Sequence, residues 1–118
     1  MNQPVRRRIL VRAVDAGRVV GVPVEAEVYG ALALHESVST LRPWTVTHVA
    51  SGSLIMTFED KPRGEAFVKG LLALDLNWEF TLPDDCPAAN GRAIERLVGR
   101  KARGGVSWRP EGRIKAAS

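Results

Sequence analysis

The sequence has few of the residues that build covalent cross-links and metal centres. Its 118 residues include one cysteine, Cys86, and two histidines, His35 and His48. A single cysteine excludes an internal disulfide and any zinc site with several cysteine ligands, and it fits a reducing cytoplasm, where we expect the protein to reside. Two histidines without acidic residues at ligand spacing form an incomplete ligand set. We therefore predict structural or surface roles for both histidines, and no bound metal or other cofactor.

Long apolar runs are also missing. No stretch approaches the roughly 20 apolar residues that span a membrane, so we expect no membrane partner. Arg6, Arg7 and Arg8 are followed by three apolar residues and then by Arg12, which leaves no room for the apolar region of a secretory signal. A chain of this length buries roughly two-thirds of its unfolded surface. We predict one domain over residues 1–103.

No set of catalytic side chains can be assembled from the sequence. Cys86 stands between Asp85 and Pro87 with no base beside it, and neighbouring carboxylates raise rather than lower the pKa of a thiol. The chain contains neither a Gly-rich phosphate loop nor the G-x-S-x-G pattern of a nucleophile elbow. We therefore predict that the protein is not an enzyme.

The clearest pattern in the chain is a β-hairpin that leads into a helix. Residues 44–49 and 53–58 alternate in the manner of strands and are rich in residues that suit a pleated sheet. Gly52 lies between them and can adopt the positive φ that a tight hairpin turn requires. The sequence therefore predicts an antiparallel pair here.

The predicted helix spans residues 63–74. Asp60 is suited to cap it, and Pro62 stands where a missing N–H costs nothing. One apolar stripe, which should cover a face of the hairpin, consists of Phe67, Leu71 and Leu74. Gly70 costs about 1 kcal/mol relative to alanine in a helix. Two interpretations stay open: it permits a close approach of helix and sheet, or the cost is simply tolerated.

Further strands are predicted before the hairpin. Residues 8–14 and 20–28 alternate on either side of a turn. Pro23 removes a ladder donor, so the second of these strands is bulged or lies at an edge. Residues 31–38 fit a strand or a helical turn, and we favour the strand.

A second helix is predicted near the C-terminal end. Residues 75–82 fit either a short strand or an extended segment, and Asn90 is suited to cap a basic helix over about residues 90–103. We expect residues 104–118 to be a basic, flexible tail. The fold class is therefore α+β: an antiparallel sheet of four to five strands packed on helix 63–74, with a second basic helix.

Charge is distributed unevenly along the chain, although the formal net charge is only +4. Residues 1–20 carry +4, residues 21–91 carry −6, and residues 92–118 carry +6. An acidic middle between two basic ends is informative about partners rather than about chemistry.

The basic ends predict a nucleic-acid partner, DNA or RNA. Four arginines of the second helix are spaced by four, four and three residues and form one cationic stripe, and guanidinium groups bind phosphate oxygens in a bidentate manner. A tryptophan beside an arginine in the tail offers a base-stacking group. The residues that we predict to contact nucleic acid are Arg6, Arg7, Arg8, Arg92, Arg96, Arg100, Lys101, Arg103, Trp108 and Arg109. The hypothesis is a non-enzymatic accessory protein whose basic groups from both ends converge on one surface.

Other interpretations stay open. A charge stripe can be merely the solvated face of a helix. An interaction module, such as a phage-encoded inhibitor or adaptor, would dock its acidic middle on a basic protein partner through Glu25, Glu27, Glu59, Asp60, Asp84 and Asp85. A structural subunit would pair its basic ends with the acidic middles of neighbouring chains, so monomer and homodimer are both open.

Residues 44–80 carry a family resemblance. The motif Trp44-Thr45-Val46-Thr47-His48, followed by Gly52 and a helix with Glu65-Ala66-Phe67 and Leu71-Leu72, resembles small uncharacterised proteins of phages, prophages and mobile elements with a W-x-V-T-H-x-x-(S/T)-G hairpin. The resemblance implies a phage or mobile-element context and assigns no binding residue. The order of four strands and a helix also resembles the single-stranded-DNA-binding cofactor fold, which is an analogy of architecture alone.

Overall fold

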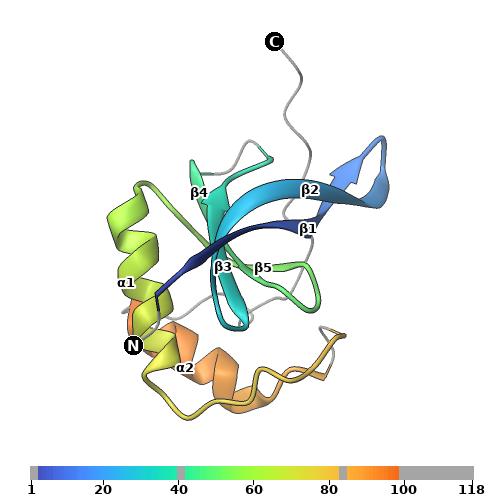
Figure 1. The fold of residues 1–118 in the computed structure, drawn as a ribbon. Helices are drawn as coiled ribbons and strands as arrows, with labels where there is room; N and C mark the ends of the chain where they lie inside the picture. Colours follow the sequence, from blue (N-terminus) through green and yellow to red (C-terminus); the bar gives the residue numbers. More distant parts are fainter. Residues whose placement is uncertain (1–2, 40–41, 83–84, 99–118) are drawn as a thin grey trace.

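The computed structural model describes residues 3–39, 42–82 and 85–98. Over these residues the chain forms β1 (Val5–Asp15), β2 (Arg18–Tyr29), β3 (Leu32–Glu36), β4 (Trp44–His48), β5 (Ser53–Phe58), α1 (Lys61–Leu72) and α2 (Ala88–Val98). The strands form one antiparallel sheet in chain order (Figure 1). The predicted α+β class and the antiparallel sheet are therefore confirmed, and residues 31–38 contain the favoured strand.

The β1–β2 hairpin is the longest pairing in the sheet. Its two-residue turn has positive φ at both Ala16 and Gly17, the type I′ geometry that matches the right-handed twist of paired strands. The register then continues without a shift to the pair Val5–Val28. β1 begins at Val5, three residues before the predicted strand, so all three consecutive arginines belong to it.

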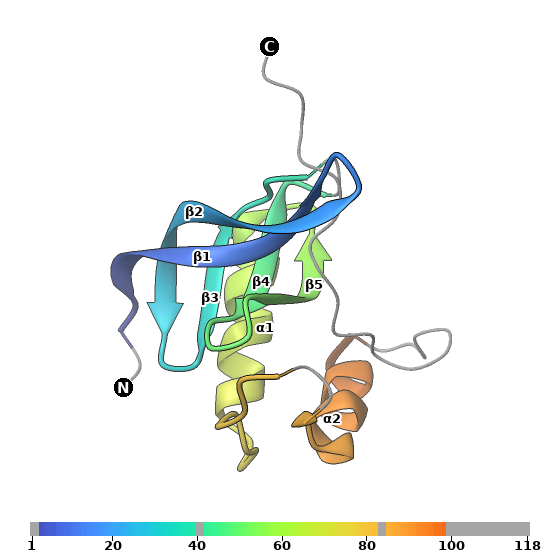
Figure 2. The same ribbon diagram turned by 90° about the vertical axis from the view of Figure 1, so that its right-hand side faces the viewer.

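β2 leaves the sheet part-way along its length. It pairs with β3 only over Glu27–Tyr29, and Figures 1 and 2 show the hairpin running across the other strands. Pro23 lies in the part of β2 that pairs with β1 but with no strand on its other side. Of the two predictions for this proline, the edge position is therefore confirmed. The backbone N–H of Arg12 donates to the carbonyl of Gly52, at 2.8 Å, which fixes the hairpin against the β4–β5 turn.

Two apolar clusters fill the fold. The smaller lies where the hairpin turns over the sheet and consists of Ile9, Val11, Ala26, Val28 and Ala33. The larger lies between the sheet and the helices and consists of Tyr29, Leu32, Leu34, Val46, Ile55, Phe67, Val68, Leu71, Trp78, Phe80, Ala93 and Ile94. The main core thus joins β2–β5 to both helices and to the segment between them.

Helix α1 begins and ends two residues before the predicted helix. Asp60 caps it, accepting a hydrogen bond from the backbone N–H of Arg63 at 2.9 Å, as predicted. Phe67 and Leu71 are buried, whereas Leu74 lies beyond the end of the helix and is 39% exposed. The predicted stripe is therefore correct for its first two members and wrong for the third.

The segment after α1 is extended and contributes Trp78 and Phe80 to the core, so the extended alternative holds over the predicted short strand. Helix α2 begins at Ala88, and Asn90 is therefore inside its first turn rather than at the predicted cap. The Asn90 side chain is fully buried and donates from Nδ2 to the carbonyl of Asn77 at 2.9 Å. The predicted continuation of this helix to residue 103 and the tail 104–118 lie outside the described residues.

Candidate nucleic-acid interface

Helix α2 presents two of the four predicted stripe arginines. Ala93 and Ile94 are buried in the main core, which turns the opposite face of the helix to solvent. Arg92 and Arg96 are exposed on that face, one turn apart. Neither of them forms an ion pair with any described residue. The other predicted contacts near this end, Arg100, Lys101, Arg103, Trp108 and Arg109, lie outside the described residues.

The three N-terminal arginines occupy the first half of β1 and are all exposed. Because side chains alternate along a strand, Arg6 and Arg8 lie on one face and Arg7 on the other. The Nε atom of Arg8 lies 3.2 Å from Oε2 of Glu25, and both side chains are more than half exposed, so this pair contributes little to stability. Arg6 faces Glu27 across the strand pair.

The described parts of the two basic ends do not share a surface. Figure 2 shows the N-terminal end of β1 and helix α2 on opposite sides of α1. The structure therefore brings Arg92 and Arg96 together on α2 but leaves them apart from Arg6–Arg8. The predicted convergence of the two basic ends is wrong for the arginines that the structure describes, because the hairpin leaves the sheet while α2 packs against α1.

A groove of about 460 Å³ runs along β1. The sequence pattern did not predict it. It lies between β1 and the β4–β5 turn, with Arg7, Arg8 and Arg12 on the β1 side and Val49 and Ser51 on the turn side. A guanidinium nitrogen of Arg12 donates to Oγ of Ser53 at 3.3 Å. The four-residue spacing of Arg8 and Arg12 was a usable signal for a shared face of the strand, but only the tertiary crossing creates the groove.

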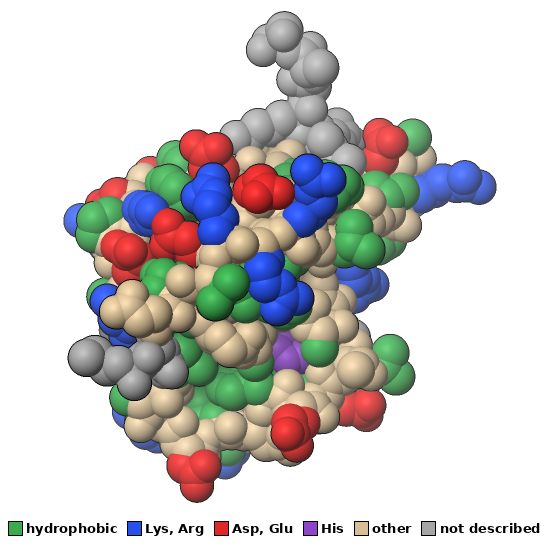
Figure 3. Space-filling view, in the orientation of Figure 1, with side chains coloured by type: hydrophobic (Ala, Val, Ile, Leu, Met, Phe, Trp, Pro, Cys, Tyr) green, Lys and Arg blue, Asp and Glu red, His purple; other side chains and the backbone are tan. Residues whose placement is uncertain are grey.

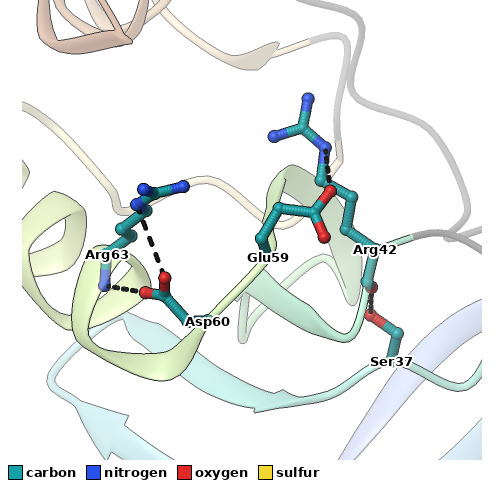
Figure 4. Close-up of polar contacts among 5 residues, drawn as sticks. All are labelled: Ser37, Arg42, Glu59, Asp60 and Arg63. Atoms are coloured by element: carbon teal, nitrogen blue, oxygen red, sulfur yellow. Dashed lines mark hydrogen bonds and ion pairs between the residues drawn. The ribbon is translucent and has the colours of Figure 1, made fainter.

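Most of the carboxylates that the interaction-module hypothesis uses form ion pairs within the chain. Figure 4 shows Glu59 beside Arg42, at 3.8 Å, and Asp60 bonded to Arg63 at the start of α1. Glu25 pairs with Arg8 and Glu27 with Lys61. Asp85 is exposed, and Asp84 lies outside the described residues. Four of the six carboxylates on which the interaction-module hypothesis depends thus have a basic partner in their own chain.

The charges of the described residues balance. They comprise eleven Lys and Arg and eleven Asp and Glu, and Figure 3 shows the two signs interspersed over one face of the molecule. The net charge of +4 therefore comes from the remaining positions, chiefly residues 99–118, with six Lys and Arg and one Glu. The segment that carries this excess of positive charge immediately follows helix α2 in the sequence.

Other site types gain no support over the described residues. No three His, Cys, Asp or Glu side chains are grouped so as to hold a metal ion, and no helix has the length and apolar character needed to cross a membrane.

Comparisons with protein-family models, curated proteins and solved structures found no match. The resemblance of residues 44–80 to phage and mobile-element proteins stays a prediction. Burial raises the pKa of the Cys86 thiol to about 11, so the thiol is protonated at neutral pH.

The two histidines are buried on opposite faces of the sheet and cannot share a ligand. His48 donates from Nε2 to the carbonyl of Trp78 at 2.9 Å and accepts at Nδ1 from the hydroxyl of Ser51 at 2.8 Å. Its ring stacks on Phe80, with 4.2 Å between centroids. Burial lowers its pKa, and the backbone bond opposes this shift in part. His35 bonds Oγ1 of Thr47 at 2.8 Å. Both imidazoles therefore have structural hydrogen-bonding roles.

Proposed function

We propose that the protein is a non-enzymatic nucleic-acid-binding accessory protein that binds phosphates through helix α2 and the basic segment that follows it. The observation that carries the proposal is the placement of Arg92 and Arg96. They are exposed, free of carboxylate partners among the described residues, and immediately precede the positive surplus of the chain. The resemblance of residues 44–80 supports a phage or mobile-element context, and the single cysteine supports a cytoplasmic one.

The physical basis is the release of condensed counterions. A protein that neutralises phosphates with Lys and Arg releases cations from the nucleic acid, so its affinity falls as salt rises. Residues 92–118 carry +6 and supply the contacts. The arginines of β1 lie on another surface and act on the approaching polyanion only at long range. Such long-range attraction is screened beyond about 8 Å at physiological ionic strength.

Binding of single- and double-stranded oligonucleotides, followed by fluorescence anisotropy between 50 and 200 mM salt, tests the proposal. For the double variant Arg92→Gln/Arg96→Gln, we expect the slope of log affinity against log salt to fall by about 1.8 on duplex or about 1.4 on a single strand. The matched control is Arg63→Gln/Lys69→Gln, which removes two exposed charges from α1 and should leave the slope nearly unchanged. Absence of binding at 50 mM salt, or equal losses in both double variants, would refute the proposal.

The interaction-module hypothesis is the less favoured proposal. Its acidic docking surface requires free carboxylates, and Glu25, Glu27, Glu59 and Asp60 are paired within the chain. A basic partner must displace these pairs before it gains contacts of its own.

A further inference from the structure

Strand β1 has one open edge. In the two-residue turn, Asp15 and Arg18 exchange backbone hydrogen bonds, and the register is unbroken from there. Every second residue of β1 therefore bonds to β2, and the even-numbered residues direct both N–H and C=O away from it. The bond from Arg12 N–H to the Gly52 carbonyl agrees with this alternation. Among the described residues, no backbone partner is recorded for the outward groups of Arg6 and Arg8.

An open edge of this length is unusual in a folded protein. Natural sheets cover, shorten or twist their edge strands because unpaired backbone groups recruit other chains. β1 has 11 residues, and among the residues that the structure describes, the β4–β5 turn covers its outer edge at the Leu10 carbonyl and Arg12. The groove of about 460 Å³ lies beside this edge, so an added chain has room to approach it.

We propose that this edge binds an extended acidic peptide segment of a partner protein by strand addition. The outward N–H and C=O groups of Arg6 and Arg8, followed by the N–H of Leu10, alternate donor and acceptor, whereas the Leu10 carbonyl lies against Gly52 of the β4–β5 turn. This pattern matches the backbone of another strand. A nucleic-acid backbone offers phosphate oxygens, which only accept, and the outward carbonyls of β1 would repel them. The edge is therefore built for a peptide, and the proposal does not depend on nucleic-acid binding at α2.

The positive charge of the β1 edge favours an acidic segment as the added strand. Arg6 and Arg8 flank the edge on one face and Arg7 on the other, so an incoming strand meets guanidinium groups on both faces. Cross-strand pairs of opposite charge stabilise a sheet, whereas like charges directly opposite destabilise it. A second copy of β1 and the basic residues 99–118 are both disfavoured for this reason. The ion pair of Arg8 with Glu25 is exposed and weak, so a carboxylate of the partner can replace it.

The groove also has an apolar element. Leu10 is 63% exposed and lines the groove together with Val49 and Ala50 of the β4–β5 turn. An antiparallel peptide with an aliphatic residue at one position and carboxylates two and four positions later can therefore place the aliphatic side chain beside Leu10 and the carboxylates beside Arg8 and Arg6, because side chains two residues apart share one face of a strand. The fitting ligand class is a short extended segment that carries one aliphatic and two acidic side chains at every second position, all on one face.

The test uses the full chain and the heptapeptide Thr-Val-Thr-Glu-Thr-Glu-Thr, which in the antiparallel direction places its valine opposite Leu10 and its glutamates opposite Arg8 and Arg6. Amide hydrogen exchange measured by NMR should slow at least tenfold for Arg8 and Leu10 at saturating peptide, while the amide of Arg12, already bonded, changes little. The matched control is the same peptide N-methylated at alternate residues, which keeps charge and composition but lacks the donors. It should bind at least tenfold more weakly.

Two variants separate the roles of charge and of the α2 site. Arg6→Gln/Arg8→Gln should weaken peptide binding about tenfold at low salt, and Arg92→Gln/Arg96→Gln should leave it unchanged. Strand addition is refuted if the N-methylated peptide binds as well as the parent peptide. It is also refuted if protection of Arg8 and Leu10 requires an oligonucleotide instead of the peptide, or develops with protein concentration alone, which would identify a second copy as the occupant.

Discussion

Two glycines of α1 allow a sharp test of how the helices pack. A Cβ added at Gly64 would lie 2.6 Å from Cδ1 of Leu34, a β3 side chain that is 1% exposed in the main core. A Cβ added at Gly70 would lie 3.3 Å from both methyl groups of Leu97 on α2, a side chain that is 43% exposed. The first neighbour is enclosed on all sides, and the second can move into solvent.

The two alanine variants should therefore differ in stability. Each gains about 1 kcal/mol of helix propensity, but Gly64→Ala also over-packs the core, which costs about 1–3 kcal/mol. We expect Gly64→Ala to be less stable than Gly70→Ala by about 1–3 kcal/mol in the free energy of unfolding. Urea denaturation with a shared m-value measures the difference. Equal stabilities, or a more stable Gly64→Ala, would show that α1 does not lie this close to β3.

Two further outcomes concern the helix cap and the buried imidazole. Asp60→Ala should lower the free energy of unfolding by about 1 kcal/mol, while Asp60→Asn, which retains the acceptor for the Arg63 N–H, should lower it far less. Thermal unfolding of both variants measures the two losses. Equal losses would contradict the capping role of Asp60. Because burial lowers the pKa of His48, its contribution is fully present above about pH 6.5 and is lost as the pH falls toward the folded pKa. The urea midpoint should therefore fall more between pH 7.5 and pH 5.5 for the wild type than for His48→Gln. Equal falls in the two proteins would contradict a stabilising contribution from the neutral His48 side chain.

The local elements were predictable because their signals are local. Asp60 and Pro62 mark the start of α1, and alternation over residues 53–58 marks β5. The end of α1 was placed two residues late because Leu74 continues the apolar spacing. The chain instead leaves the helix there and turns back toward the core with Trp78. Spacing alone does not distinguish a helical stripe from an apolar residue in the following loop.

The arrangement of charges was not predictable from the sequence. Counting charges by segment correctly separates basic ends from an acidic middle, but the strand register decides which charges meet. Register places Arg8 opposite Glu25 and Arg6 opposite Glu27, so one basic end is partly neutralised by the middle. Of the two interpretations left open for Gly70, the close approach to the sheet does not hold: that approach occurs at Gly64, and Gly70 faces Leu97 of α2. Both the pairing of charges and the environment of Gly70 depend on contacts between residues far apart in the sequence.

The open edge of β1 follows from the same long-range contacts. Gly52 has a φ of +68°, and a Cβ at this position would lie 3.1 Å from the carbonyl oxygen of Leu10 and 3.2 Å from Cγ of Arg12. Only a residue without a side chain allows the β4–β5 turn to approach β1 this closely, and the bond to Arg12 then fixes where the crossing occurs. Among the described residues the turn covers β1 from the Leu10 carbonyl onward, so β2 holds the strand before Leu10 in an extended conformation while no described segment pairs with its other edge. The fold thus pre-organises this edge, which removes much of the ordering cost that an added strand would otherwise impose on β1.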